Sequence, residues 1–219
     1  MTPPTEPVPT PAVVIGIAAR RPVTAVWVNE LGGVTFAIDG GAEYVKVIPP
    51  GSDAEILRLD WAADYLTVPR VLGSGSTWLH TRGLPGSSAV DPRWLRDPRT
   101  AARAIGAGLR LIHDTLPVDD CPFGSPAWVT EAPDVDRLVV CHGDACAPNT
   151  LIDDAGRCCG HVDLGDLGVA DHWADLAVAE WSLRYNYEGD WRAEFFDAYG
   201  VAPDQDRMDH YLRLWEDGE

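Results

Sequence analysis

The chain has 219 residues, of which 34 are acidic and 17 are basic, giving a formal net charge of -17. Its length permits either one large domain or two lobes with a substantial core. The acidic excess argues against nucleic acid or an anionic membrane as a partner, and it slightly favours a cationic ligand.

Residues 1–11 are rich in Pro and Thr and are expected to form a loose leader. The apolar run at 12–19 is too short to span a bilayer. Arg20 and Arg21 follow this run, which is the wrong order for a signal peptide. The sequence therefore predicts a cytoplasmic protein, in which the five cysteines are reduced thiols.

A β-hairpin is predicted first, because strand-like runs at 25–29 and 34–38 flank Leu31, Gly32 and Gly33. A Gly-Gly pair between two strands is common turn chemistry. The alternative interpretation is a flap whose backbone amides approach phosphate groups. No Walker A motif occurs in the sequence, so a P-loop is excluded.

Lys46 is the only lysine among the 17 basic residues, and it lies in the strand-like run 43–48. A compact ammonium group suits a polyphosphate better than a planar guanidinium does, so this lysine is a candidate phosphate ligand. A helix is expected to follow from Ser52 to about Tyr65. Its Glu55 either completes a Ser-x-x-Glu capping box or pairs with Lys46 to position nucleotide phosphates.

Helical patterns dominate the second half of the chain. Residues 97–115 repeat apolar side chains at helical spacing, which predicts a long central helix, and residues 85–92 are expected to precede it as a junction. A second helix is expected to begin after Asp171 and to run to about Leu183. Asp175 lies one turn into that helix, from where it could reach the backbone of the preceding loop.

Three oxygen-bearing side chains surround one predicted hairpin: Asp144 and Asn149 precede its first strand, and Asp163 ends its second. Phosphoryl transfer needs a carboxylate that accepts the proton of the acceptor hydroxyl, and it needs oxygen ligands that hold Mg²⁺ on the phosphates. These three residues could supply those groups.

The register of this hairpin can be estimated by counting. If the turn is centred between Gly156 and Arg157, the paired residue numbers sum to about 313. Asp163 then lies opposite Thr150, and Asn149 is its neighbour at the mouth of the hairpin.

Cysteine and histidine residues crowd the same hairpin, which raises zinc binding as an alternative; they are Cys141, His142, Cys146, Cys158, Cys159 and His161. The spacing contains no C-x₂-C pair, and alternate residues of a strand face opposite sides of the sheet. Both features argue against a zinc site.

Four stretches carry a resemblance to a known family, and they read VVCHGDACAPNTLID, HVDLGDLGVADHWADLAVA, EILRLDWAADYLTVPRVLG and LRLIHDTLPVDDCP. They resemble the aminoglycoside phosphotransferase family, a branch of the protein-kinase-like fold, over most of residues 25–216. The resemblance implies a bilobal α+β fold. A small N-terminal lobe at 12–83 has an antiparallel β-sheet and one helix, and a larger, mainly helical lobe at 84–219 carries a catalytic β-hairpin.

The resemblance also implies phosphorylation of a hydroxyl on a small cationic acceptor, with ATP or GTP and Mg²⁺ as cofactors. Asp144 resembles the catalytic aspartate, and Asn149 and Asp163 resemble the metal ligands. Lys46 and Glu55 resemble the pair that positions the phosphates.

Further roles follow from the same family pattern. Thr81 and Gly83 lie in a stretch that resembles the connector whose backbone meets the adenine. His142 and Asp175 would support the catalytic loop. Glu216, near the end of the chain, could bind the acceptor. The alternative is that the acidic residues at this end form a frayed, solvated tail without a ligand.

One departure from the family concerns the acceptor, because only a short Pro-rich connection links Asp120 to Arg137, where many members have additional helices. Three interpretations therefore stay open. They are an aminoglycoside phosphotransferase, a kinase of another metabolite alcohol such as an amino alcohol or a sugar, and a nucleotide-binding pseudoenzyme. The last is disfavoured because the candidate site residues are intact, namely Lys46, Asp144, Asn149 and Asp163. The sequence does not specify the oligomeric state.

Overall fold

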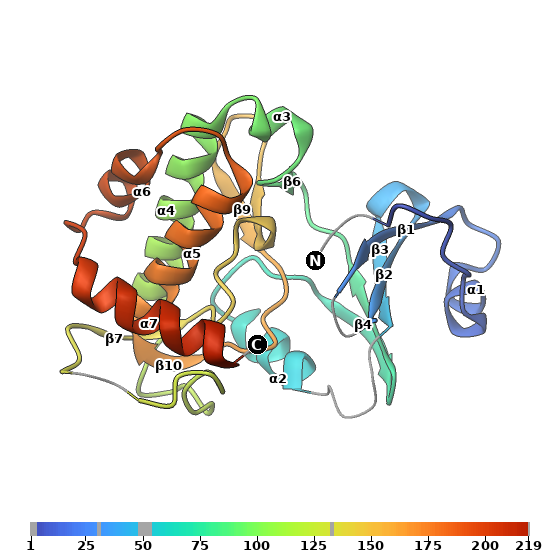
Figure 1. Cartoon of the computed structure of the whole chain (residues 1–219). Helices are drawn as coiled ribbons and strands as arrows, with labels where there is room; N and C mark the ends of the chain where they lie inside the picture. Colours follow the sequence, from blue (N-terminus) through green and yellow to red (C-terminus); the bar gives the residue numbers. More distant parts are fainter. Residues whose placement is uncertain (1–3, 30–31, 48–53, 132–133, 219) are drawn as a thin grey trace. The chain divides into compact units, whose positions relative to one another are not determined.

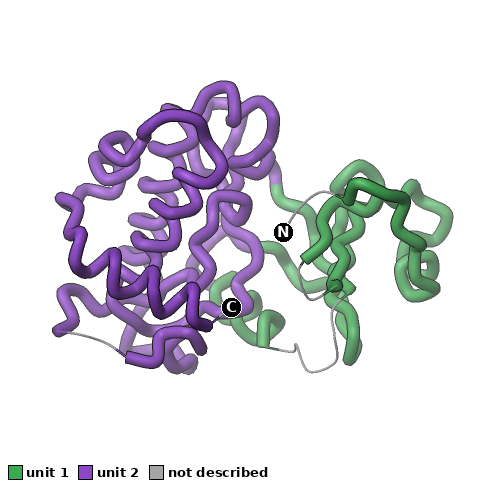
Figure 2. The backbone as a smooth tube through the Cα atoms, in the orientation of Figure 1, with its two compact units in different colours: residues 1–63, 69–84 green, residues 64–68, 85–219 purple. Residues whose placement is uncertain are grey.

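The computed structural model describes residues 4–29, 32–47, 54–131 and 134–218. The chain divides into two compact units, drawn in different colours in Figure 2. Unit 1 comprises residues 1–63 and 69–84, and unit 2 comprises residues 64–68 and 85–219.

Unit 1 contains a five-stranded antiparallel sheet with the strand order β1-β2-β3-β5-β4 (Figure 1). Two α-helices and one short 3₁₀ turn accompany the sheet. Their bounds are α1 Ala12–Ala18, β1 Val23–Val28, β2 Val34–Ile38, the 3₁₀ turn Asp39–Gly41, β3 Glu43–Val47, α2 Ala54–Ala62, β4 Val71–Gly75 and β5 Trp78–Arg82.

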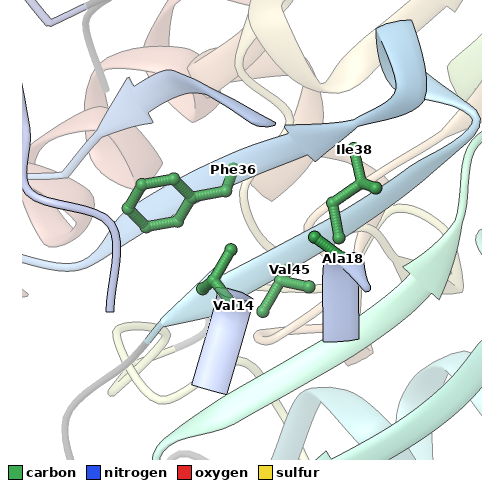
Figure 3. Packing of buried hydrophobic residues seen from close by; sticks show 5 residues of the cluster. All are labelled: Val14, Ala18, Phe36, Ile38 and Val45. Carbon is green, nitrogen blue, oxygen red and sulfur yellow. The ribbon is translucent and has the colours of Figure 1, made fainter. Parts of the chain in front are cut away.

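The core of unit 1 lies between helix α1 and one face of this sheet. Figure 3 shows Val14 and Ala18 of α1 packed against Phe36, Ile38 and Val45 of strands β2 and β3. Side chains alternate between the two faces of a strand. The strand β3 therefore turns its odd-numbered residues toward α1 and presents its even-numbered residues on the opposite face.

Glu43 of β3 sits in a cluster of basic side chains on unit 1. Its Oε2 accepts a hydrogen bond from Arg21 at 2.9 Å and lies 2.9 Å from Nε2 of His80, while Oε1 accepts from Arg82 at 3.4 Å. The hydrogen bonds from Arg21 and then His80 hold the pKa of Glu43 at about 2, below its ordinary value of 4.5. The ionised form is thus favoured by folding.

Replacing Glu43 by glutamine should therefore destabilise the fold by about 1 to 3 kcal/mol at pH 7, because charged hydrogen bonds are lost. A lowered pKa contributes stability above the unfolded value and loses it as pH falls through the folded value. The gap in melting temperature between wild type and Glu43→Gln should hence close as pH falls from 4.5 to about 2. Thermal unfolding at several pH values measures it, with the exposed Glu6→Gln as the control; a gap independent of pH would contradict the assignment.

Unit 2 is mainly helical, and Figure 1 shows its helices α4, α5, α6 and α7 beside short strands. The strands pair as β10-β7 and as β6-β8-β9. The bounds are β6 Ser87–Ser88, α3 Pro92–Leu95, α4 Pro98–Thr115, β7 Leu138–Cys141, a 3₁₀ turn Ala147–Asn149, β8 Thr150–Ile152, β9 Cys158–His161, β10 Gly168–Asp171, α5 His172–Asn186, α6 Arg192–Tyr199 and α7 Gln205–Gly218.

The long helix expected over 97–115 is confirmed as α4. The side chain of Asp97 caps its N-terminus by accepting a hydrogen bond from the backbone amide of Thr100. Gly106 allows α6 to approach closely, because a Cβ at this position would lie 2.3 Å from the carbonyl oxygen of Phe195. Helix α5 likewise begins after Asp171, whose carboxylate accepts from the amide of Trp173.

The register predicted for the hairpin of β8 and β9 is wrong. Strand β8 pairs with β9 so that Thr150 faces His161 and not Asp163, and the register shifts between Leu151 and Ile152. Two features cause the difference: this irregularity, and a φ of 62° at Asp163, which does not continue an extended strand. Asp163 therefore lies beyond the paired strands.

The helix expected from Ser52 to Tyr65 is shorter in the structure. Helix α2 ends at Ala62, and Ser52 of the proposed capping box lies outside the described residues. Within the described ranges, none of the helices combines the length and apolar character that crossing a membrane requires.

Candidate functional site

Asp144 and Asn149 meet within one loop of unit 2. The side-chain nitrogen of Asn149 donates to the backbone oxygen of Asp144 at 3.0 Å and to its carboxylate Oδ2 at 2.9 Å. Pro148 and the 3₁₀ turn Ala147–Asn149 restrict the backbone between them. The amide of Asn149 thus fixes the direction of the Asp144 carboxylate.

The other end of the Asn149 amide is unused. Its Oδ1 is buried and has no hydrogen-bond partner among the described residues, and the residue is only 2% exposed. Buried polar atoms in native proteins nearly always have a partner, and an orphan at a functional site calls for a ligand. An amide oxygen suits a hard cation such as Mg²⁺.

Asp163 follows Val162, whose backbone is hydrogen bonded to that of Asn149. The amide of Val162 donates to the backbone oxygen of Asn149 at 3.0 Å, so the two chain segments are adjacent. The expected closeness of Asn149 and Asp163 along the backbone therefore arises through Val162 and not through the predicted pairing with Thr150. The two residue types together form an oxygen donor set that fits Mg²⁺.

Asp175 of α5 holds the backbone of the loop. Its two carboxylate oxygens accept from the amides of His142 at 2.6 Å and Gly143 at 3.0 Å. The side chain is fully buried, and burial alone would raise its pKa. The hydrogen bond from His113, the nearby histidine rings and the amide of Gly143 together outweigh the effect of burial, so the pKa of Asp175 is lowered and the carboxylate stays ionised.

Gly143 is required by its surroundings. It has a φ of 86°, and a Cβ at this position would lie 2.1 Å from the carbonyl oxygen of Asp166. Its own carbonyl oxygen accepts a hydrogen bond of 2.7 Å from the indole of Trp128. Trp128 lies in the short connection between Asp120 and Arg137, and sequence reasoning missed it, because nothing in its spacing links it to the loop.

The ring of His142 is hydrogen bonded at both of its nitrogens. Its Nδ1 accepts from the amide of Asp144 at 3.3 Å, and its Nε2 donates to the backbone oxygen of Val162 at 3.0 Å. Two such contacts assign the hydrogen to Nε2. The ring of His142 therefore links the backbone of Asp144 to that of Val162, the residue before Asp163.

Unit 1 carries the remaining candidate residues. Nζ of Lys46 lies 2.9 Å from Oε2 of Glu55, and both side chains are largely buried. Lys46 is on the face of β3 opposite α1, and Thr81 on β5 is paired with Tyr44 of β3. The pairing of Lys46 and Glu55 is thus a feature of unit 1 alone.

The glycines of unit 1 have distinct environments. Gly32 has a φ of 80°, and the amide of Gly33 donates to Oδ1 of Asn29 at 2.6 Å. Leu31 lies outside the described residues. At Gly83, a Cβ would lie 1.9 Å from the carbonyl oxygen of Gly41, so no other residue fits there.

Glu216, the candidate acceptor ligand, is exposed on helix α7 of unit 2. No hydrogen bond or ion pair of Glu216 is found within the described part of the chain. Its position is compatible either with binding a cation or with ordinary solvation.

The zinc alternative is not supported by the described residues. The one potential metal group there contains His113, Cys141 and Asp175, and no member comes from the second strand of the hairpin. His113 and Asp175 are bonded to each other at 3.0 Å. Cys141 donates to the backbone oxygen of Asp171, and burial raises the pKa of its thiol well above the ordinary value, so it remains protonated.

Comparisons with known proteins relate this chain to phosphotransferases. A family model described as the phosphotransferase enzyme family matches residues 125–211. The chain is 32% identical to the streptomycin 3''-kinase of Streptomyces griseus, over 87% of this chain and 90% of the relative. It is 33% identical to an aminoglycoside 3'-phosphotransferase of Streptomyces ribosidificus, over 86% of this chain and 92% of the relative.

A solved aminoglycoside phosphotransferase of Streptomyces rimosus has the same fold. It superimposes with a TM-score of 0.73 and 28% identity, covering 92% of this chain and 94% of the solved one. A second structure of that enzyme, in complex with ADP and streptomycin, aligns with a TM-score of 0.66. The chain therefore belongs to the aminoglycoside phosphotransferase family, small-molecule kinases of protein-kinase-like fold that phosphorylate a hydroxyl group.

Proposed function

We propose that this protein phosphorylates a hydroxyl group of an aminoglycoside in the cytoplasm, with ATP or GTP as the donor and Mg²⁺ as the metal. The proposal depends on the side-chain amide of Asn149, whose nitrogen and oxygen have different roles. Its nitrogen orients the carboxylate of Asp144, and its oxygen is left without a partner among the described residues.

Asp144 is assigned the role of general base. Its Oδ2 is fixed by Asn149, which leaves the carboxylate able to accept a proton from an acceptor hydroxyl. The backbone on either side is also held, because Asp175 bonds the amide of Gly143. A base that is fixed before the acceptor arrives loses little entropy on reaction.

Asn149 and Asp163 are the residues that would hold Mg²⁺. The metal would supply neutralisation of the charge on the transferring phosphates. Lys46, kept in place by Glu55 at 2.9 Å, is assigned to the phosphates as well. The amides of Leu31, Gly32 and the following residue, together with Thr81 and Gly83, are proposed to contact the nucleotide.

The acceptor is proposed by similarity and by charge. The relative in complex with ADP binds streptomycin, and a net charge of -17 attracts a polycation near the site. The alignment with the Streptomyces griseus kinase has 246 positions, more than the 219 residues of this chain, so that kinase contains segments that this chain lacks. The absence of such segments from this chain favours a more open acceptor site, and Glu216 is proposed as one carboxylate in it.

A coupled assay of ADP release tests this function. Wild-type protein is given Mg-ATP and a panel of aminoglycosides, amino alcohols and sugars. Turnover of an aminoglycoside supports the proposal, and turnover only of another alcohol replaces it by the kinase of a metabolite. If the protein binds nucleotide but no acceptor in the panel causes release of ADP, the pseudoenzyme interpretation is the one that remains.

Replacing Lys46 by arginine should lower kcat/KM by about 10²-fold although the charge is retained, because a planar guanidinium replaces the compact ammonium between Glu55 and the phosphates. Steady-state kinetics with varied ATP measures the effect. The exposed Arg96→Lys, the reverse exchange, serves as the control and should behave as wild type. Full activity of Lys46→Arg would remove the argument that this lysine is special.

A further inference from the structure

A continuous chain of side chains connects the catalytic loop to the surface of unit 2. Asp175 Oδ2 lies 3.0 Å from His113 Nε2, and His113 Nδ1 lies 2.8 Å from the hydroxyl of Tyr199. The same hydroxyl lies 2.9 Å from Nδ1 of His172, whose Nε2 lies 3.1 Å from Oδ2 of Asp136. We call these five residues the relay.

The ends of the relay differ in exposure. Asp175 is fully buried and bonds the backbone of His142 and Gly143, whereas the side chain of Asp136 is 51% exposed. The relay members come from helices α4, α5 and α6 and from the segment before β7, so they are brought together only by the fold. A surface carboxylate is thereby bonded, residue by residue, to the loop that carries Asp144.

The relay needs one more hydrogen than its neutral residues bring. Its four contacts are hydrogen bonds, so each needs one hydrogen. Ionised Asp175 and Asp136 only accept, and each neutral histidine and the tyrosine bring one hydrogen apiece. Three hydrogens cannot fill four bonds. One of the two histidines must therefore carry a second hydrogen and be positively charged.

Both carboxylates are in the ionised form that this count assumes. The pKa of Asp136 is lowered by hydrogen bonds from Trp173 and then His172. The pKa of Asp175 is lowered despite its burial. Neither end of the relay therefore supplies the missing hydrogen at neutral pH.

The extra hydrogen is disfavoured on His172, because burial lowers the pKa of its ring. Two further groups lie near Asp175. Burial lowers the pKa of His161 to about 3 and raises that of the Cys141 thiol, so both are uncharged at neutral pH and neither balances the charge of Asp175. A fully buried carboxylate needs a counter-charge. The other ionisable groups near the relay are Cys141, His142, Asp171, Arg110, Arg137 and Arg207.

We propose that His113, Tyr199, His172 and Asp136 are positioning residues that hold the catalytic loop through Asp175, and that this relay carries one proton more than its neutral residues bring. The kinetic part of this inference rests on the proposed function, and the proton count does not. If the relay loses its extra proton at high pH, one of its bonds breaks and the support of the loop weakens.

Nuclear magnetic resonance of the full chain tests the proton count without any activity. In wild type labelled with ¹⁵N, one imidazole ring of the relay should show two protonated nitrogens at pH 7. Tyr199→Phe keeps the ring but removes the two central bonds, so two neutral histidines then satisfy the remaining two. The doubly protonated signal should persist to higher pH in wild type than in Tyr199→Phe. Identical titrations, or two neutral rings in wild type, would overturn the count.

Kinetics test the positioning role. Tyr199→Phe and Asp136→Ala should lower kcat about 3- to 30-fold with KM for both substrates unchanged, because each removes bonds of the relay. The decline of kcat at high pH that the relay causes should disappear in both variants, because their remaining bonds need no more hydrogens than the neutral residues bring. The matched control is Tyr187→Phe, since Tyr187 is also buried and donates to the backbone oxygen of Ala89 at 2.6 Å, outside the relay.

The control separates positioning from stability. Both tyrosine variants should lose stability, but only Tyr199→Phe should change kcat and its pH dependence. Equal kinetic behaviour of the two variants would refute the positioning role. Absence of phosphorylation by wild type with every acceptor would instead refute the proposed function, and the resonance experiment would still decide the proton count.

Discussion

Replacing Asp144 by alanine should lower turnover on the order of 10²- to 10⁴-fold while nucleotide affinity stays nearly constant, because the lost carboxylate acts on the acceptor hydroxyl and not on the nucleotide. Asn149 also loses the acceptor of one hydrogen bond, but its second bond, to the backbone oxygen of residue 144, remains. Single-turnover kinetics and calorimetric titration with Mg-ATP measure the two effects separately.

The exposed Asp119→Ala is a suitable control for this substitution, since it removes the same charge from a residue of unit 2 that has no assigned role. It should leave both turnover and affinity unchanged. Unchanged turnover in Asp144→Ala would exclude this residue as the base.

Replacing Asp163 by alanine should abolish Mg²⁺-dependent nucleotide binding, because the carboxylate is a proposed ligand of the metal. Asp163→Gly makes the sharper experiment. Asp163 has a φ of 62° in the left-handed region, where a non-glycine residue costs about 1 kcal/mol or more. Glycine adopts this φ without strain, so the variant should keep its melting temperature and still lose the metal-dependent binding.

Calorimetry with ATP in the presence of Mg²⁺ and of a chelator measures the loss, and thermal unfolding checks the fold. Tight Mg-ATP binding by Asp163→Gly would count against a ligand role. A collapse of the melting temperature would contradict the strain argument but not the metal assignment.

Local signals in the sequence predict much of the fold. The aspartate before α4 and the helical spacing that follows it define that helix to within one residue, because caps and periodicity act over short distances. The loop with Asp144 and Asn149 is equally local. Its residues are five apart, and their side chains are hydrogen bonded.

Non-local features could not be predicted in the same way. The irregularity between Leu151 and Ile152 moved the register of the hairpin, and such bulges leave little trace in a single sequence. Helix α1 was not expected either, since a run with several β-branched residues has little helical preference and is stabilised by packing on the sheet. The relay joins residues from His113 to Tyr199, and only tertiary structure aligns them.

The two ends of the Asn149 side chain explain why an amide is needed there. Aspartate has the same shape, but it has no hydrogen to give to its neighbour across 2.9 Å. Two carboxylates at that separation cannot both ionise and would share a proton. The base would then be blocked at neutral pH, so a change of one atom at a residue that never touches the migrating proton could silence the enzyme.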